Sequence, residues 1–410
     1  MATGPQVPEP AHRVAEVIAQ AGGQAWLVGG WVRDQFLKRP GMDLDLEVSG
    51  LSATEIETHL SRLGPVSRVG RAFPVFKLRI GSCTLDIAQP RSNSLPDGRA
   101  QVDPTLPIEE SAARRDLTIN AIALNPLTGQ VCDPFGGKKD LENRRLRAVE
   151  PSLFLDDTLR VLRVARFAAQ LHFHPDDELI ALCLTAQWSG VASERIGIEI
   201  SKMLCAPHPR HGLEIAQKLG IWRHLLPELE DLPLSPSADA LDRLPALVSW
   251  LGSESRLLTV GLAILLHRLE GDSLETAMDR LDVHRRDGLN LRHEIRQAII
   301  KQAELRRDCR PSALRWAAED SELVLALGLA LSLEPRDDLQ ESLALAREMG
   351  ILHASMLPLI MGRDLIAYGI PSGTQVGELL EQVRAEQLDG RISTPEEALR
   401  FVEDLAHLEP

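Results

Sequence analysis

The chain has 410 residues and a formal net charge of −14, and 44% of its residues are hydrophobic. That is the composition of an ordinary soluble protein with room for two or more domains. The acidic balance argues against nucleic-acid binding over the whole surface, because phosphates are neutralised by Lys and Arg. A single tyrosine and 4% aromatic residues also argue against a base-stacking platform of the RRM or OB type.

The N-terminal stretch lacks the basic start and apolar core of a signal peptide. The longest apolar run, residues 323–333, is well short of the roughly 20 residues that a membrane span needs, so we expect a cytoplasmic protein. The cysteines have no CxxC or CxxH spacing, which predicts neither a disulfide framework nor a zinc site. We expect reduced core residues at Cys83, Cys132, Cys183, Cys205 and Cys309.

Apolar runs bounded by Gly, Pro and Ser predict strands in the first 145 residues. The expected strands lie at 25–30, 44–48, 75–80 and 84–88. Helical spacing of apolar residues predicts helices at 9–21, 53–63 and 111–124. We therefore expect an α/β or α+β domain with a small sheet.

Residues 91–110 hold turn formers and few apolar anchors. A structureless connection of that length in a compact domain is usually functional or mobile, so we expect a moving element here. From about residue 146 onward, apolar residues recur at spacings of three and four, which predicts helices in the rest of the chain. The polar, proline-containing stretch 230–240 is the best candidate for a linker between helical subdomains.

A basic stretch lies within this helical part. Between Arg285 and Arg315, nine Arg or Lys residues stand against four Asp or Glu. The stretch is a candidate for a local basic face, and a solvated helix surface is the alternative interpretation.

Two acids in GMDLDLEV, Asp43 and Asp45, are two residues apart, so on a strand both side chains point to the same face. Paired carboxylates suit Mg²⁺, although an isolated pair is also typical of an exposed, charged strand edge. The Gly-Gly turn of VGGWVRD, residues 28–34, lets the backbone approach a phosphate before a helix. Asp86 lies between apolar residues on a later strand. Together these elements have the layout of a two-metal nucleotidyl-transfer site.

Five segments carry a resemblance to a known family. They are LVGGWVRD, DLDLEV, RRDLTINAIAL (114–124), DPFGGKKDL (133–141) and LDDTLRVLRVARFAAQL (155–171). With these motifs in this order, the chain resembles class II tRNA nucleotidyltransferases, the CCA-adding branch of the DNA polymerase β-like superfamily, which also contains bacterial poly(A) polymerases. The match covers roughly residues 25–205, about half of the chain.

The resemblance implies a fold and a division of the chain. The fold class is α+β, with a polymerase β-like nucleotidyltransferase head of a small mixed sheet and helices, followed by an all-helical neck, body and tail. The expected parts are the catalytic head at 1–145, the nucleotide-selecting neck and start of the body at 146–229, and a tRNA-binding body and tail at 230–410.

The resemblance also assigns roles to residues of the head. Asp43 and Asp45 are the expected Mg²⁺ ligands, and Asp86 matches a third carboxylate, with a structural role as the alternative. The residues expected to bind the nucleotide are Gly29, Gly30, Arg33, Arg114, Arg115, Asp116 and Asn120. Arginine pairs offer fork-shaped donors to phosphate oxygens, and the neighbouring aspartate can accept from a ribose hydroxyl. Without the family motifs, an Arg-Arg-Asp trio at a helix start would indicate only capping and surface charge.

The segment DDTLRVLRVARF places acids and arginines on one predicted helix. Asp156 and Asp157 lie four and three residues before Arg160, so the three can meet as weak surface ion pairs. The resemblance implies another role, because the family motif Glu-Asp-x-x-Arg selects the base without a nucleic-acid template. A carboxylate accepts from the exocyclic amine of cytosine or adenine, and a guanidinium donates to the adjacent ring nitrogen. Asp157 and Arg160 would contact the base, with Asp156 holding the arginine. Arg163 and Arg166 would contact the nucleotide.

This chain departs from the family pattern at two places. Asp156 stands where Glu is usual, and the 91–110 segment is a few residues shorter than the family's flexible loop. Both departures bear on whether Arg160 is repositioned for the switch from C to A. Some relatives also carry a phosphohydrolase site marked by His-Asp in an apolar helix, whereas here His267 precedes Arg268. We expect a core or capping histidine there and predict no hydrolase activity.

The expected activity is Mg²⁺-dependent, template-independent addition of CMP and AMP from CTP and ATP to the 3′ end of tRNA, with release of pyrophosphate. The acceptor stem and T arm would be held by backbone contacts and shape. The alternatives are a partial enzyme that adds only CC or only A, a poly(A) polymerase, and a non-catalytic RNA-binding protein. The intact Asp43, Asp45, Arg115 and Arg160 argue against the last, because a pure binder has no use for paired metal ligands.

Overall fold

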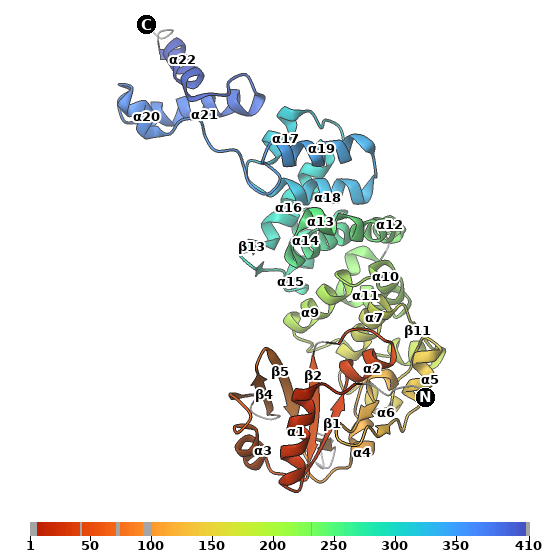
Figure 1. Ribbon diagram of the computed structural model, residues 1–410. Helices are drawn as coiled ribbons and strands as arrows, with labels where there is room; N and C mark the ends of the chain where they lie inside the picture. The colour runs from red at the N-terminus through yellow and green to blue at the C-terminus, as the bar shows by residue number, and fades with distance from the viewer. Residues whose placement is uncertain (1–5, 42, 71–73, 93–100, 231, 407–410) are drawn as a thin grey trace. The chain divides into compact units, whose positions relative to one another are not determined.

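The structure is a computed structural model that describes residues 6–41, 43–70, 74–92, 101–230 and 232–406. The chain divides into two compact units, one of residues 1–191 with 215–221 and one of residues 192–214 with 222–410. Figure 1 shows the main sheet in the first unit and helices along the rest of the chain. The expected α+β class with a helical C-terminal part is confirmed. The functional division at residues 145 and 229 stays a prediction.

The first unit is built on a seven-stranded sheet in the order β3-β4-β5-β2-β1-β8-β9. Its strands are β1 (Gln24–Val28), β2 (Leu44–Ser49), β3 (Val66–Val69), β4 (Val75–Ile80), β5 (Cys83–Ala88), β8 (Ala123–Leu124) and β9 (Val131–Cys132). Neighbouring strands are antiparallel, except that β2 and β5 run parallel. All four predicted strands are confirmed, and the sheet is mixed as expected.

Short helices surround this sheet. They are α1 (Glu9–Gln20), α2 (Gly30–Phe36), α3 (Ala53–Leu60), α4 (Ile108–Ala112), α5 (Gly137–Glu142), α6 (Pro151–Phe154), α7 (Leu159–Leu171) and α8 (Asp177–Cys183), with the 3-10 turn η1 (Thr118–Asn120). Two-residue strands pair as β6 (Arg91–Ser92) with β7 (Gln101–Val102), and β10 (Arg145–Leu146) with β11 (His174–Pro175). The predicted helices at 9–21 and 53–63 are confirmed as α1 and α3.

Alternation along β2 sets the two faces of the sheet. Leu44, Leu46 and Val48 are buried, whereas Asp45 and Glu47 between them point to the opposite face and stay partly exposed. α1 packs against β1 and β2, and α3 packs against α1 (Figure 1). The apolar face of β2 therefore belongs to the core, and its polar face carries the candidate site.

The predicted helix at 111–124 is wrong. α4 ends at Ala112, and the following residues form η1 and then β8, which pairs with β1. Asp116 accepts hydrogen bonds from the Leu117 amide (2.8 Å) and from Asn120 (3.0 Å), and such local bonds compete with helix formation. Every residue from Leu117 to Leu124 is buried, so the apolar spacing reflects burial on all sides and not one helix face.

The segment 91–110, expected to be structureless and mobile, has ordered ends. β6 and β7 pair in antiparallel fashion across it, and α4 begins at Ile108. Residues 93–100 lie outside the described residues. A moving element at this place therefore stays a prediction.

From residue 192 onward the chain is almost entirely helical. The helices are α9 (Ser193–Leu204), α10 (Pro209–Lys218), α11 (Ile221–Leu225), α12 (Ser235–Arg243), α13 (Val248–Leu251), α14 (Glu254–Leu266), α15 (Gly271–Arg280), α16 (Leu291–Leu305), α17 (Pro311–Ala317), α18 (Leu323–Leu333), α19 (Asp337–Glu348), α20 (Gly362–Ala367), α21 (Thr374–Asp389) and α22 (Pro395–Ala406). The 3-10 turns are η2 (Pro227–Leu229) and η3 (Leu244–Leu247), and one hairpin pairs β12 (Arg285–Arg286) with β13 (Leu289–Asn290).

The longest apolar run of the sequence forms the core helix α18. Its residues from Leu323 to Ser332 are all buried, and the helix packs against α14, α16 and α19. None of the helices in the described part of the chain has the length and apolar character needed to cross a membrane. α20, α21 and α22 share a smaller apolar core of their own that includes Leu365, Val383 and Val402.

The linker predicted at 230–240 is wrong over its second half, because α12 begins at Ser235. Pro236 lies in the first turn of that helix, where a missing amide hydrogen costs nothing. His267 takes the C-cap position of α14, and its Nδ1 lies 2.8 Å from the Ile264 carbonyl. The capping interpretation of that histidine is confirmed.

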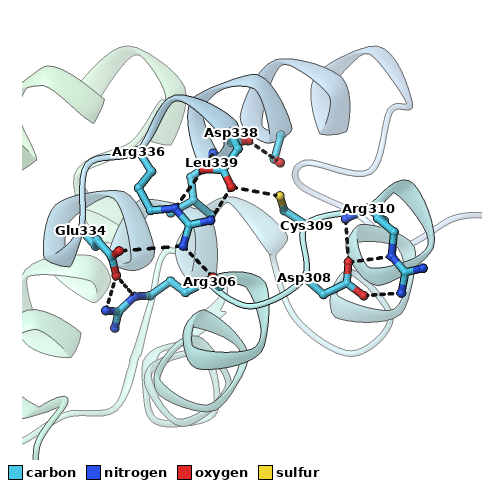
Figure 2. Close-up of polar contacts among 9 residues, drawn as sticks. Arg306, Asp308, Cys309, Arg310, Glu334, Arg336, Asp338 and Leu339 are labelled. Atoms are coloured by element: carbon cyan, nitrogen blue, oxygen red, sulfur yellow. Dashed lines mark hydrogen bonds and ion pairs between the residues drawn. The ribbon is translucent and has the colours of Figure 1, made fainter.

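Most of the basic residues between Arg285 and Arg315 are paired with acids. The pairs are Arg286–Glu254, Arg292–Glu275, Arg292–Asp279, Arg296–Glu275, Lys301–Asp320, Arg306–Glu334 and Arg310–Asp308. Figure 2 shows Arg306 facing Glu334 (Nε to Oε2, 2.7 Å), while Arg336 donates to the carbonyl of Arg306 (2.7 Å). The stretch is therefore largely neutralised by carboxylates from other elements.

The five cysteines are all free thiols. Cys132 and Cys183 are buried as expected, whereas Cys83, Cys205 and Cys309 are only partly buried, so the core assignment is right for two of them. Burial raises the thiol pKa to about 12 for Cys183 and Cys205 and to about 11 for Cys132. These three thiols therefore stay protonated and unreactive at neutral pH.

Candidate active site

Two strands bring acidic side chains together on the polar face of the sheet. β2 and β5 run parallel with Asp45 directly beside Asp86, and Asp43 lies exposed just before β2. Nζ of Lys77 on β4 lies 2.9 and 2.8 Å from the two carboxylate oxygens of Asp86. Within the described residues, no group of three or more His, Cys, Asp or Glu side chains is arranged to hold a metal ion. Asp86 is therefore engaged by Lys77, and the assignment of Asp43 and Asp45 as metal ligands stays a prediction.

The turn before α2 brings the backbone close to Asp45. Gly29 has a φ of 71°, a left-handed conformation that glycine adopts without strain. A Cβ at this position would lie 3.2 Å from Oδ2 of Asp45 and 3.7 Å from Nη1 of Arg115. Any side chain here would crowd the carboxylate, so glycine preserves the space between Asp45 and the guanidinium. Gly30 then begins α2.

The net effect of the surroundings of Asp45 is to disfavour its charged form. Burial raises the pKa of Asp45 to about 6, Arg115 and Lys77 oppose this shift, and the carboxylates of Asp86 and Asp43 add to it. Such a carboxylate gains from a neighbouring cation, because desolvation and like charges both disfavour its charged form. The pair therefore fits Mg²⁺, which takes one or two protein carboxylates and completes its shell with water and substrate phosphates.

Arg115 reaches from this carboxylate cluster to a second acid. Its Nη2 lies 3.3 Å from Oε2 of Glu47, the residue two positions beyond Asp45 on the same face of β2. Both side chains are mostly buried, at 24% and 11% exposed. Glu47 thus holds one end of the guanidinium, while the other end lies near Gly29.

Asp116 is the centre of a buried hydrogen-bond network. Its Oδ2 accepts from Nε of Arg163 (2.7 Å), and its Oδ1 accepts from Asn120 (3.0 Å) and from the Leu117 amide (2.8 Å). Burial alone would raise the pKa of Asp116, but Arg163 and these hydrogen bonds hold it below the usual value. Asn120 in turn accepts from Nη1 of Arg33 (2.9 Å). Both oxygens of Asp116 are therefore in use, and its contact with a ribose hydroxyl stays a prediction.

Three predicted nucleotide-binding arginines gather around one aromatic ring. The guanidinium carbons of Arg33, Arg163 and Arg166 lie 5.3, 5.4 and 4.2 Å from the centre of the Phe167 ring. At these distances each cation is attracted to the face of the ring. Phe167 therefore links the position of α2 to that of α7.

The predicted helical spacing of Asp156 and Asp157 with Arg160 is wrong. α7 begins two residues after Asp157, whose Oδ1 accepts from the first amide of the helix (3.1 Å). Aspartate favours such capping positions over helix interiors because its side chain competes for backbone hydrogen bonds. Asp156 is exposed. The guanidinium of Arg160 donates to the carbonyls of Leu153 (2.9 Å) and Arg114 (2.7 Å), so main-chain groups hold it in place.

A pocket of about 260 Å³ opens on the polar face beside these residues. Its lining residues are Glu47, Ala88, Gln89, Arg91, Ser111, Arg114, Arg115 and Arg160. The fold thus brings the Arg-Arg pair and Arg160 together across 45 positions of the chain. It places Arg33, Arg163 and Arg166 in the separate group around Phe167.

Sequence reasoning misses four residues of this site: Glu47, Lys77, Arg91 and Phe167. Glu47 continues the alternation of the two carboxylates on β2, and that spacing is a usable signal. Lys77 is found only from the strand register, which sets it opposite Asp86. Phe167 follows Arg163 and Arg166 by four residues and one residue in α7, and that spacing is a usable signal. Arg91 carries none, because its pocket neighbours Glu47 and Arg114 come from distant segments.

Two known families and several curated proteins match the chain. The family described as "Poly A polymerase head domain" matches residues 25–147, and the one described as "Probable RNA and SrmB- binding site of polymerase A" matches residues 185–232. The chain is 32% identical over 321 residues to the multifunctional CCA protein of Cupriavidus metallidurans, covering 73% of this chain and 75% of that protein. It is 36% identical over 311 residues to the protein of the same name from Pseudomonas paraeruginosa, covering 71% and 72%.

Solved structures show the same fold over almost the whole chain. A CCA-adding enzyme in complex with CTP superposes with a TM-score of 0.73 at 25% identity, covering 98% of this chain and 95% of that one. The Thermotoga maritima CCA-adding enzyme complexed with tRNA superposes with a TM-score of 0.70 at 24% identity, with the same coverage. The sheet and the helical part thus follow the architecture of these enzymes.

Proposed function

Since the chain belongs to the class II, CCA-adding family of tRNA nucleotidyltransferases, we propose that it completes the whole CCA end of tRNA in a reaction that requires Mg²⁺. CMP and AMP are taken from CTP and ATP without a nucleic-acid template, and pyrophosphate is released. A cytoplasmic location, where tRNA and nucleoside triphosphates occur together, is part of this proposal.

The observation that carries the proposal is the convergence of Gly29, Asp45 and Arg115 on one space. Gly29 has no side chain, and a Cβ atom added there would contact both the carboxylate of Asp45 and the guanidinium of Arg115. This combination suits a cation and a phosphate bound together, because the carboxylate attracts the cation and the guanidinium attracts the phosphate.

Asp43 and Asp45 would hold Mg²⁺, which when bound polarises phosphate oxygens and favours deprotonation of an attacking hydroxyl. Arg115 would neutralise charge on the triphosphate beside this pair. Lys77 would keep the carboxylate of Asp86 occupied, so that two carboxylates and not three serve the cation.

Asp157 and Arg160 would select the base. The carboxylate accepts from the amine that cytosine and adenine share, and the guanidinium donates to the adjacent ring nitrogen. Uracil and guanine present a carbonyl to the carboxylate instead, and leaving buried groups unpaired costs roughly 1–3 kcal/mol. Because carbonyls of Leu153 and Arg114 hold Arg160, a shorter side chain at Asp156 does not by itself release the arginine.

The test supplies the purified protein with tRNA transcripts that lack the terminal CCA, CA or A. Each transcript is incubated with CTP alone, ATP alone or both, and products are resolved at single-nucleotide length. Two C residues and one A, each added only to the correct transcript, are expected. Addition that stops before A identifies a CC-adding enzyme, and addition of A alone identifies an A-adding enzyme. A long A tail identifies a poly(A) polymerase, and no incorporation contradicts the enzyme.

A further inference from the structure

The pocket beside the carboxylates is lined by more positively than negatively charged side chains. We call it the Glu47 pocket; its charged lining groups are Glu47, Arg91, Arg114, Arg115 and Arg160. Four guanidinium groups against one carboxylate favour an anion, and forked donors suit phosphate oxygens. At about 260 Å³ the pocket holds one small group and no stretch of duplex. The proposed function gives no role to Glu47 or Arg91.

Two polar atoms in this wall are buried and have no hydrogen-bond partner among the described residues. They are Oε1 of Glu47 and Nη1 of Arg114. The other carboxylate oxygen of Glu47 accepts from Arg115 (3.3 Å), so the side chain is held with one oxygen to spare. Buried polar atoms in folded proteins are normally satisfied by a ligand or by water when the protein itself offers no partner. A ligand that matches both atoms presents a hydrogen-bond donor and an acceptor.

The pocket lies close to the reacting centre. Glu47 is two residues beyond Asp45 on the same face of β2, which is about 7 Å along a strand. Arg115 connects the two places, because its Nη1 lies near Gly29 and its Nη2 contacts Glu47. An attacking hydroxyl has to come within about 3.5 Å of the phosphorus. The nucleotide that carries this hydroxyl therefore has to lie directly beside the carboxylates.

We propose that the Glu47 pocket binds the terminal nucleotide of the acceptor RNA, an inference that rests on the proposed function. Arg91 and Arg114 contact its phosphate, which assigns Arg114 to the acceptor RNA and not to the incoming nucleotide that the family resemblance implies for it. Oε1 of Glu47 accepts a hydrogen bond from one of the donors of the terminal nucleotide. Two donors have this chemistry, the ribose 2′-hydroxyl and the exocyclic amine of cytosine or adenine. Arg160, which lines the same pocket, sets the terminal nucleotide next to the incoming base.

The test compares acceptor RNAs that differ by one donor. Transcripts ending in cytidine, in 2′-deoxycytidine and in uridine are extended with CTP by the wild type and by Glu47→Ala and Glu47→Gln. Glu142→Ala is the matched control, because it removes an exposed glutamate from α5, outside the pocket. The measured quantity is the ratio of kcat/KM between the cytidine-ended RNA and each altered RNA. This ratio does not depend on the fraction of enzyme that is folded.

The wild type and the control are expected to prefer the cytidine-ended RNA over one altered RNA by about 5- to 30-fold, the loss that one hydrogen bond gives. Glu47→Ala reduces this preference to less than about twofold, and Glu47→Gln, which keeps an acceptor, retains part of it. Loss against the deoxy RNA identifies the hydroxyl as the donor, and loss against the uridine RNA identifies the amine. Arg91→Ala raises KM for RNA and leaves KM for CTP within about twofold.

Three outcomes overturn the inference. They are the absence of any preference in the wild type, an unchanged preference in Glu47→Ala, and a rise of KM for CTP equal to that for RNA in Arg91→Ala. The last outcome would place the incoming nucleotide in the pocket. Failure of the wild type to extend any transcript contradicts the proposed function instead, so the two failures are distinguishable.

Discussion

Arginine is abundant in both units of the chain, but its surroundings differ. In the helical unit, six of the nine basic residues between Arg285 and Arg315 face carboxylates. In the first unit, Arg114, Arg115 and Arg160 share a pocket in which Glu47 is the one acidic lining residue. The density of charges along a sequence therefore does not locate an anion-binding site. The ratio of cations to carboxylates in space does, and it makes a net charge of −14 compatible with an RNA substrate.

The largest effect on activity is expected from substitution of the two neighbouring acids of the first unit, Asp43 and Asp45. Asp43→Ala combined with Asp45→Ala should lower incorporation of CMP by more than about a thousandfold, because metal ligation supplies several kcal/mol of transition-state stabilisation. Asp86→Asn is the matched variant on the neighbouring strand. Since Lys77 already neutralises Asp86, it should cost far less, and single-turnover rates at saturating CTP measure both. Equal losses would make Asp86 a third ligand and refute the two-carboxylate assignment.

The next effect concerns stability at the edge of the site. Asp116→Ala should lower the free energy of unfolding by about 2–3 kcal/mol, because it leaves Arg163 and Asn120 without their shared buried acceptor. The folded-state pKa of Asp116 is lowered, so its contribution is present above the unfolded value of about 3.9 and is lost as the pH falls through the folded value. Urea unfolding should therefore show a wild-type advantage at pH 7 that shrinks below about pH 4. A gap that does not depend on pH would exclude the ionised pair as its source.

Substitutions of the adjacent acids Asp156 and Asp157 should differ in their effect on base selection. Asp157→Ala is expected to reduce the preference for CTP over UTP by about 10- to 100-fold, because it removes the acceptor for the exocyclic amine. Asp156→Ala should change it by less than about threefold, since carbonyls of Leu153 and Arg114 position Arg160. Competition assays with both nucleotides present measure the ratio directly. If Asp156→Ala has the larger effect, Asp156 holds Arg160 in position, as the glutamate of the family motif is expected to do.

Much of the first unit could be predicted because local patterns coincide with the final burial. The alternation of Leu44, Asp45, Leu46 and Glu47 predicts both a strand and its polar face, and the structure confirms both. The helix predicted at 111–124 failed for the opposite reason, because residues 117–124 are all buried and their apolar pattern has no preferred period.

The internal geometry of the site could not be predicted, because it depends on contacts between distant segments. Spacing alone set Asp156 on a helix with Arg160, but the partners of this arginine are carbonyls, one of them 46 positions away at Arg114. Likewise, nothing in the sequence around Lys77 indicates that it stands opposite Asp86 until the register of β4 and β5 is known. Composition shows which charges exist, and only the fold shows which of them meet.

The smallest effect is expected in the helical unit, where the arginines are already paired. Glu275 accepts from Arg292 (2.8 Å) and from Nη2 of Arg296 (2.6 Å). The hydrogen bond from Arg296 and the bonds and charge of Arg292 lower the pKa of Glu275 to about 2, so the carboxylate is ionised throughout the working range. Because these side chains are partly exposed, Glu275→Gln should lower the free energy of unfolding by less than about 1 kcal/mol.

The same substitution tests whether pairing keeps this unit from binding RNA through those arginines. Glu275→Gln removes the charged partner of Arg296, whereas Arg292 keeps its pair with Asp279, so RNA should bind more tightly and the slope of log affinity against log salt should steepen by about one. Arg292→Ala with Arg296→Ala is the matched control and should leave wild-type RNA affinity nearly unchanged, because both groups are already neutralised. A large loss of affinity in that control would show that the paired arginines contact RNA. In that case the paired carboxylates would orient these arginines to bind phosphate. The two units would then differ in how their arginines are oriented and not in how many of them lack an acidic partner.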